Sequence, residues 1–195
     1  MAEGAEVQLW WGSLLQADRD LLPLLDEIER ARVSALDRPA DQGRSMVGAA
    51  LLRTAVAADL GCPPSQVLLD RTCADCGEQH GSPRVRGPLP STRDLPPWVS
   101  VAHSGFVVVV ALCRTHPVGV DVQRLADLDS TTDGWTWVSG ESRLKAGAPD
   151  RPTTDSDVTW SGPVDVPLAG YLAALTVCGT TAPPRVQQHP RVPPI

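Results

Sequence analysis

Two oxygen-bearing side chains alternate with valines in one short segment, VGVDVQ at 118–123. If this segment is a β-strand, successive side chains point to opposite faces, so Asp121 and Gln123 share one face and the valines the other. Carboxylate and amide oxygens are hard ligands, and two of them on one face could bind a single divalent cation. A polar residue at a strand end more often meets only solvent, so the spacing alone leaves both interpretations open.

An acid and a base follow on a segment of helical character at 136–147. Trp137, Glu141 and Lys145 are spaced four residues apart, which places them on one face of a helix. An exposed ion pair between the glutamate and the lysine would account for this spacing. Alternatively, the helix brings a carboxylate and an ammonium group to Asp121, and the combination would suit a magnesium ion bound to a pyrophosphate.

A third candidate is the segment CADCGEQH at 73–80. Cys73, Cys76 and His80 could be three zinc ligands, with Cys62 as a distant fourth, because closed structural zinc sites have four ligands. A loop with reduced thiols is the favoured interpretation, and zinc is the alternative. A redox CxxC centre is less favoured, since no thioredoxin-like βαβ pattern surrounds the motif.

The elements that must position these residues are helices and strands around an apolar centre. Hydrophobic periodicity predicts helices from Asp18 to about Leu36, over 41–60 and over 136–147. Three apolar runs predict consecutive neighbouring strands of one buried sheet, at 98–104, 106–113 and 117–122. Further strands are predicted at 7–11, 67–70, 157–160 and 170–178. A polar surface loop is predicted at 71–97, and disorder in the proline-rich tail from Thr180.

Composition narrows the classes of protein. The chain has 195 residues, of which 42% are hydrophobic, enough to bury a core in one domain or two small packed halves. A formal net charge of -6 argues against broad binding to nucleic acid. We expect a cytoplasmic protein that binds no membrane, since no apolar run is of membrane-spanning length and no signal-peptide pattern is seen. Five cysteines, an odd number, fit reduced thiols or a metal site better than a disulfide framework.

The order of the motifs resembles that of the Sfp-type 4'-phosphopantetheinyl transferase superfamily. That family carries an arginine-bearing helix pair, a Gly-basic-Pro turn, a strand ending in Ser-His-Ser, a Gly-Ile/Val-Asp-Val/Ile-Glu strand and a helix with Trp-x-x-Lys-Glu-x-x-x-Lys. The matching segments here are ERARVSALDRPADQGRSMVGAALLR at 29–53, HGSPRV at 80–85, VSVAHSG at 99–105, VGVDVQ at 118–123 and WVSGESRLKAG at 137–147. With GYLAAL at 170–175 as its last segment, the resemblance covers residues 7–178.

The resemblance implies a fold and an activity. The fold would be α+β, with two similar α+β halves, 1–115 and 116–179, packed as a pseudo-dimer and followed by a disordered tail at 180–195. The activity would be transfer of the 4'-phosphopantetheine group from coenzyme A to a serine of an acyl or peptidyl carrier protein. We therefore expect a magnesium-dependent enzyme that acts as a monomer, with coenzyme A and a carrier protein as its partners.

Carried over position by position, the resemblance also implies residue roles. The implied magnesium ligands are Asp121, Gln123 and Glu141. The implied catalytic groups are Glu141, as the base for the serine hydroxyl, and Lys145, which neutralises or protonates the leaving phosphate. The implied contacts to coenzyme A are Arg32, Arg44, His103 and Ser104.

Three positions depart from the family pattern, each with a loss of charge. Gly140 stands where the helix usually has Lys, Gln123 where the strand usually has Glu, and Ser82 where the turn usually has Lys or Arg. The stretch from Asp121 to Glu141 is also short and lacks the family's Phe-Ser-x-x-Glu segment. One alternative is therefore a degenerate member that binds coenzyme A or a carrier protein with little or no transfer. A small zinc-loop interaction module is the other.

Overall fold

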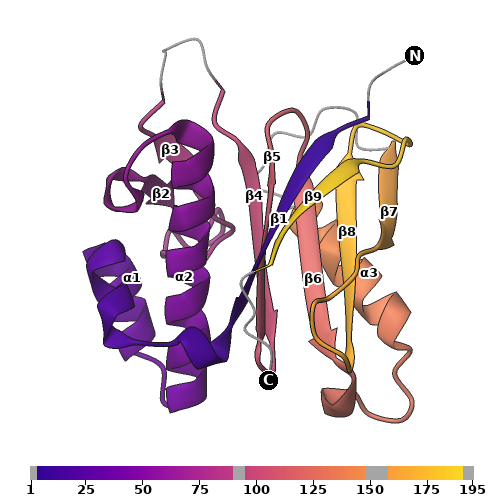
Figure 1. Cartoon of the computed structure of the whole chain (residues 1–195), viewed down its shortest axis with the longest axis horizontal. Coiled ribbons are helices and arrows are strands. Elements are labelled where there is room, and N and C mark those ends of the chain that lie inside the picture. Colours follow the sequence, from indigo (N-terminus) through magenta and orange to yellow (C-terminus); the bar gives the residue numbers. More distant parts are fainter. Residues whose placement is uncertain (1–3, 90–94, 148–157, 191–195) are drawn as a thin grey trace.

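The computed structural model describes residues 4–89, 95–147 and 158–190. Its helices and strands are β1 (Glu6–Ser13), α1 (Glu27–Ser34), α2 (Pro39–Leu60), β2 (Leu68–Asp70), β3 (Arg84–Gly87), β4 (Trp98–Ser104), β5 (Val107–Cys113), β6 (Val118–Arg124), α3 (Gly134–Ala146), β7 (Thr159–Pro163), β8 (Tyr171–Cys178) and β9 (Arg185–Pro190). The fold class is α+β, as predicted. Two sheets lie in the middle of the molecule, with α1 and α2 on one side and α3 on the other (Figure 1).

The first sheet has the strand order β4-β5-β1-β9. Its inner strand β5 is buried at every position, because α2 covers one face and the second sheet covers the other. Val108 and Val110 pack in the cluster with α2, whereas Val107 and Val109 pack in the cluster between the sheets. Burial on both faces explains why the β5 sequence is uniformly apolar instead of alternating.

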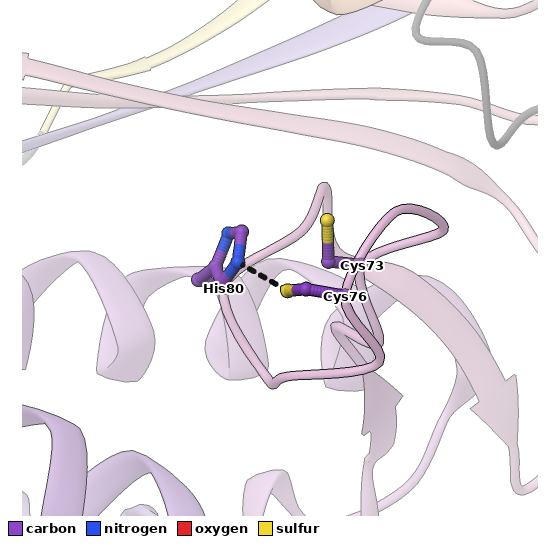
Figure 2. A group of neighbouring side chains, drawn as sticks. All are labelled: Cys73, Cys76 and His80. Carbon is purple, nitrogen blue, oxygen red and sulfur yellow. Dashed lines mark hydrogen bonds between the residues drawn. The ribbon is translucent and has the colours of Figure 1, made fainter.

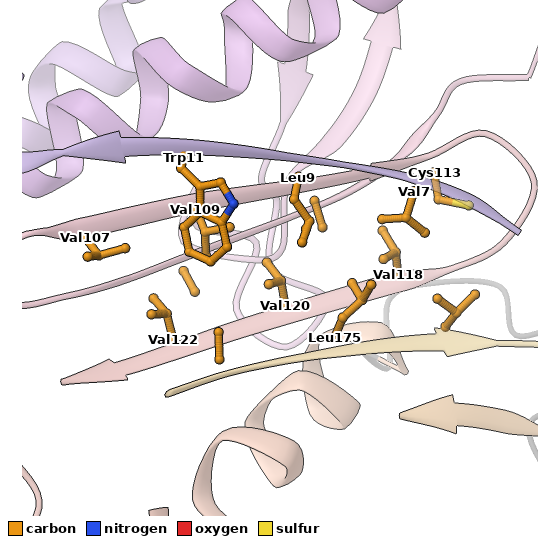
Figure 3. Packing of buried hydrophobic residues seen from close by; sticks show 14 of the residues in the cluster. Val7, Leu9, Trp11, Val107, Val109, Cys113, Val118, Val120, Val122 and Leu175 are labelled. Carbon is orange, nitrogen blue, oxygen red and sulfur yellow. The ribbon is translucent and has the colours of Figure 1, made fainter. Parts of the chain in front are cut away.

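The second sheet has the strand order β6-β8-β7 and carries α3 on its outer face. Its inner face meets β1 in a core that Figure 3 shows from close by, where Leu9 and Trp11 of β1 lie opposite Val120 and Val122 of β6. This core fixes the positions of β6 and β8, and so of the outer face on which α3 packs.

The prediction that the three central apolar runs are neighbours in one sheet is wrong for the third run. Strands β4 and β5 pair antiparallel, but β6 pairs with β8 in the second sheet. Strand β6 still lies beside β4, where serine hydroxyls replace a backbone ladder: Ser100 Oγ accepts from the Val120 N–H at 3.1 Å, and Ser104 Oγ from the Arg124 N–H at 2.9 Å. The two sheets therefore meet along a seam of side-chain hydrogen bonds.

The first predicted helix is divided. Asp18 caps a 3₁₀ turn at Arg19–Leu24 that contains Pro23, and an α-helix starts only after Asp26. Proline lacks a backbone N–H, and Asp26 with Glu29 forms a capping box that favours a new start. The single helix expected from Asp18 to Leu36 was therefore wrong.

A buried ion cluster ties α1 to α2. The guanidinium of Arg53 lies 2.6 Å from a carboxylate oxygen of Glu29 and 2.6 Å from one of Asp26, and it donates to the Val67 carbonyl at 2.8 Å. Arg53 is only 2% exposed. Loss of either partner of such a pair leaves a charge uncompensated, so this arginine has a structural role in placing the segment that enters β2.

The predicted disorder of the tail from Thr180 is wrong for the residues that form β9. This strand pairs parallel with β1, and the His189 ring stacks on Trp10 with centroids 4.2 Å apart. Proline is tolerated because β9 is an edge strand, where one row of N–H groups has no ladder partner. Residues 191–195 lie outside the described part of the chain. The division into two similar halves and their pseudo-dimeric relation stay predictions, and the first sheet takes a strand from beyond residue 179.

Part of the predicted loop at 71–97 is also a strand, because β3 pairs antiparallel with β2. The loop that connects these two strands contains the Cys-x-x-Cys segment. All five cysteines are free thiols. Cys113 and Cys178 are buried in the strands, as expected from their apolar surroundings. No helix among the described residues is both long and apolar enough to cross a bilayer.

Candidate functional site

The site begins at Asp121 in β6, which lies on the opposite face of the strand from the core. Val118, Val120 and Val122 point into the core between the sheets, and Asp121 alternates with them. Asp121 is buried, with 7% of its surface exposed, and it has a charged partner, because Lys145 Nζ of α3 lies 2.6 Å from Oδ1. The structure thus brings the strand-borne acid and the helix-borne base into direct contact.

Helix α3 reaches β6 closely because position 119 has no side chain. A Cβ atom at Gly119 would lie 2.0 Å from the Ser142 carbonyl oxygen and 2.5 Å from the Ala146 nitrogen. The hydroxyls of Ser142 and Thr176 share a hydrogen bond of 2.8 Å that joins α3 to β8, and Asp133 caps the start of the helix. This close packing holds the Glu141 and Lys145 turn of α3 over Asp121.

The charges at this point of contact are unbalanced. Burial raises the pKa of Asp121, the ammonium of Lys145 opposes that rise, and the negative charge of Glu141 adds to it. Glu141 is therefore near enough to act on the Asp121 carboxylate. With both acids ionised, two negative charges face one ammonium, and a divalent cation would relieve their repulsion. Carboxylate oxygens are the ligands that Mg²⁺ prefers, so these residues fit the predicted ion.

Gln123 lies two positions along β6 from Asp121, so strand alternation places both on the same face. Its side chain is half-buried, and its amide nitrogen donates to the Arg124 carbonyl at 3.2 Å. A role for its oxygen as a metal ligand stays a prediction.

A surface hollow of about 320 Å³ lies beside Glu141 on the outer side of α3. The residues that line it are Thr132, Asp133, Thr136, Trp137, Gly140, Glu141 and Leu144. Trp137 is 48% exposed and Leu144 is 68% exposed, so large apolar side chains border the acid without entering the core. Such an arrangement could receive part of a second molecule next to Glu141.

His103, near the end of β4, joins this group from the first sheet. Solvent reaches its side chain, yet the surrounding protein is dense enough that burial lowers the pKa of His103 below its ordinary value. The positive charges of Arg44 in α2 and Lys145 in α3 lower the pKa further. His103, Arg44 and Lys145, from three distant elements, are therefore electrostatic neighbours.

Arg44 and Ser104 hold the backbone around His103. Arg44 donates to the Gly105 carbonyl at 3.0 Å and forms an ion pair with Asp41. The Ser104 hydroxyl accepts the hydrogen bond that joins β4 to β6. Both residues thus have structural partners at the seam, and their contact with coenzyme A stays a prediction.

Arg32 has a different neighbour, Arg71, which sequence reasoning missed. The pKa of Arg71 is lowered to about 10, first by burial and next by the charge of Arg32. Arg71 Nε is buried without a hydrogen-bond partner among the described residues. Arg71 thus lies close to a second guanidinium and has an unsatisfied donor, with the carboxylates of Glu29 and Asp26 also near it. The signal that could have identified Arg71 was its position as a cation at the start of the polar segment 71–97.

The three residues predicted as possible zinc ligands in the Cys-x-x-Cys segment also lie close together. Cys73, Cys76 and His80 have ligand atoms within 4.8 Å of one another. Figure 2 shows the three side chains close together on the loop. The N–H groups of Asp75 and Cys76 donate to the Cys73 sulfur and lower its pKa. Cys62, the expected distant fourth ligand, is absent from this group and packs against the core beneath α2, so that part of the prediction is wrong.

Comparison with known proteins supports the family resemblance. A curated protein of Synechocystis sp., provisionally named a 4'-phosphopantetheinyl transferase, is 32% identical to this chain over 120 residues. The chain is similar to that transferase. The alignment covers 60% of this chain and 44% of the relative, so the chain spans less than half of the relative's length. No protein-family model matches the chain.

Proposed function

We propose that the chain is a magnesium-dependent enzyme that transfers the 4'-phosphopantetheine group of coenzyme A to a serine of a carrier protein. The observation that carries this proposal is the convergence of Asp121, Glu141 and Lys145 where α3 packs on β6, with His103 and Arg44 as electrostatic neighbours. The similarity to the Synechocystis protein supports the same reaction.

The acidic residues would hold the metal. Asp121 and Glu141 would supply carboxylate oxygens, and Gln123 would supply a neutral amide oxygen on the same strand face. When bound, magnesium supplies positive charge that stabilises the diphosphate and the developing leaving group.

The remaining groups account for the transfer itself. The carrier serine oxygen forms a bond to the β-phosphorus of coenzyme A, and the bond from that phosphorus to the oxygen of the departing 3',5'-ADP breaks. Glu141 takes the serine proton. The ammonium of Lys145 then neutralises the charge that accumulates on the leaving phosphate. His103 and Arg44 orient the phosphates.

Exposed apolar side chains on α3 support a protein partner. Trp137 and Leu144 are 48% and 68% exposed, and both border the hollow beside Glu141. Contiguous exposed apolar surface marks interaction sites. A carrier protein on this surface would bring its serine to the Glu141 side of the site. A cytoplasmic location and a monomeric state remain predictions.

The lost charges favour a second candidate, a protein that binds coenzyme A without transfer. Gly140 leaves α3 without the lysine usual in the family, and nothing lies within 4 Å of the space where its Cβ would be. Gln123 likewise offers no charge to a metal. Both changes weaken the electrostatic stabilisation of a phosphate transition state.

The test is incubation of the chain with coenzyme A, magnesium and a panel of apo carrier proteins, with intact mass as the readout. We expect one carrier to gain the mass of one phosphopantetheine group, only when magnesium is present. Asp121→Asn should abolish the gain, whereas Asp127→Asn, which removes a half-exposed carboxylate in an ion pair with Arg124, should preserve it. Binding of coenzyme A without modification of any carrier would select the second candidate, and absence of both would overturn the two.

A further inference from the structure

Two thiols and an imidazole lie together on the loop between β2 and β3, away from the Asp121 site. Cys76 Sγ and His80 Nε2 are 3.0 Å apart, and Cys73 Sγ completes a group in which every pair of ligand atoms lies within 4.8 Å (Figure 2). Cys73 is half-buried, and Cys76 and His80 are exposed, so an ion can reach all three. The proposed transfer reaction uses none of them.

The spacing of these atoms is close to that of a zinc site. Zinc binds sulfur at about 2.3 Å and nitrogen at about 2.0–2.1 Å, so tetrahedral ligand atoms lie roughly 3.5–3.8 Å apart. The observed atoms, within 4.8 Å of one another, need shifts of only about 1 Å to reach that arrangement. Rotation of exposed side chains can supply such shifts without moving the core.

The loop backbone already has the turn that two cysteines need to share one ion. The Cys73 N–H donates to the Glu78 carbonyl at 2.8 Å, and the Gly77 N–H donates to the Cys73 carbonyl at 3.0 Å. Gly77 has a φ of 78°, which favours glycine. These backbone hydrogen bonds hold Cys73 and Cys76 in one turn.

The closing end of the loop places His80 beside the two cysteines. The Gly81 N–H donates to the Arg71 carbonyl at 2.7 Å, which closes the loop immediately after His80. A Cβ at Gly81 would lie 3.0 Å from the Arg71 oxygen and 3.2 Å from the Cys73 Cα, so the two arms of the loop pass very close to each other. The histidine is thus placed by the closure itself.

We infer that Cys73, Cys76 and His80 bind one zinc ion with a fourth position open to water or a small thiol. Two thiolates and an imidazole select zinc over magnesium and calcium, which prefer oxygen. The position is open because Cys62 lies elsewhere. The ion would link the two arms of the loop and so fix the segment that begins with Arg71.

The experiment measures metal directly and does not depend on transfer activity. The full reduced chain is purified without chelator and its zinc content is measured by mass spectrometry. The metal-free chain is then titrated with Co²⁺. We expect about one zinc per chain, and visible cobalt bands of a tetrahedral site with sulfur charge-transfer absorption. Addition of dithiothreitol should change the cobalt spectrum, because the open position accepts a thiol.

Variants distinguish this site from other thiols. Cys76→Ser and His80→Asn should each lose stoichiometric zinc and the cobalt bands, whereas the control Cys62→Ser should keep both. Circular dichroism checks that each variant is folded. The inference is overturned by a wild-type chain that binds no metal, by a Cys73–Cys76 disulfide seen as a loss of two hydrogens in the intact mass, or by equal loss of metal in Cys62→Ser.

Discussion

The two groups of proposed metal ligands in this molecule are assembled in different ways. Asp121 and Lys145 lie 24 residues apart and meet only because α3 packs on the outer face of β6. Cys76 and His80 lie four residues apart, on one loop held by its own backbone hydrogen bonds. The oxygen-rich group therefore depends on tertiary packing, and the sulfur-containing group on local turn geometry. A change that disturbs one should leave the other intact.

The largest expected effect comes from Gly119→Ala. The new methyl would collide with the backbone of α3, since the nearest oxygen is 2.0 Å from the Cβ position. We expect the free energy of unfolding to fall by about 3 kcal/mol or more, with loss of carrier modification, because the helix must move away from Asp121. Denaturant unfolding and the intact-mass assay measure the two effects.

Gly140→Ala is the matched control on the same helix, because nothing lies within 4 Å of its Cβ position. It should raise stability by about 0.5–1 kcal/mol through helix propensity. Zinc content should be unchanged in both folded variants. Normal carrier modification by Gly119→Ala would contradict the claim that close packing of α3 on β6 assembles the site.

The second effect is smaller and concerns charge rather than packing. Lys145→Met should lower kcat by about 100-fold, because an ammonium that stabilises the leaving phosphate is lost. It should also raise the pKa of Asp121, which burial and Glu141 already raise and only Lys145 strongly opposes. A higher pKa means that the carboxylate ionises at higher pH, so the acid limb of the pH–rate profile should move upward.

Arg143→Met removes a cation from the exposed side of the same helix and serves as the control for this charge effect. It should leave the acid limb of the profile in place. If Lys145→Met and the wild-type chain have the same pH profile, Lys145 does not affect the pKa of Asp121, and this prediction is wrong.

How well the sequence predicted each group depends on whether its residues are close together in the chain. The Cys73–His80 spacing is local, so the ligands could be proposed from the chain alone, although Cys62 was wrongly added. The approach of Glu141 to Asp121 depends on contacts between distant elements. The strand and helix patterns offered it as one of two interpretations, and the family resemblance favoured it. Arg71 was missed because its burial and its nearness to Arg32 are tertiary properties that no sequence period encodes.

The fold shows a similar division. Elements with strong periodicity or uniform apolar character, such as α2 and β5, were predicted within about two residues. Pairing was harder, because β6 follows β5 in the chain and is also buried over its first five residues, and yet it pairs in a different sheet. The edge strand β9 escaped prediction because its sequence, RVQQHP, is polar and its order comes from pairing with β1 and from the contact of His189 with Trp10.

A third prediction addresses the local group alone. Gly77→Ala places a side chain at a φ of 78°, which costs roughly 1–2 kcal/mol. Since about 1.4 kcal/mol is a factor of ten in affinity, zinc affinity measured by chelator competition should fall about tenfold. Gly61→Ala has a similar conformational cost at a φ of 68° after α2, and it should leave the affinity unchanged. Equal losses in both variants would mean that global destabilisation, rather than the turn, sets the affinity.

The smallest expected effect tests the seam where the two sheets meet. Burial and two neighbouring cations keep the pKa of His103 below its ordinary value, so the imidazole is neutral at about pH 7. A bound phosphate favours the protonated ring and raises that pKa, so binding of coenzyme A should take up a fraction of a proton. Affinity should therefore strengthen, by less than about tenfold, as the pH falls from about 8 to about 6. Calorimetry in buffers of different ionisation enthalpy measures both the affinity and the proton uptake.

His103→Gln should remove this pH dependence, because the amide cannot be protonated in that range. His116→Gln should retain it, since His116 is hydrogen-bonded to Thr115 and lies near Gly179, away from the seam. If His103→Gln keeps the full proton uptake, the phosphates do not lie beside His103. Coenzyme A would then have to bind elsewhere than at the seam between β4 and β6, and the candidate is the arginine pair Arg32 and Arg71. Arginine side chains do not titrate near neutral pH, so no such pH dependence is expected there.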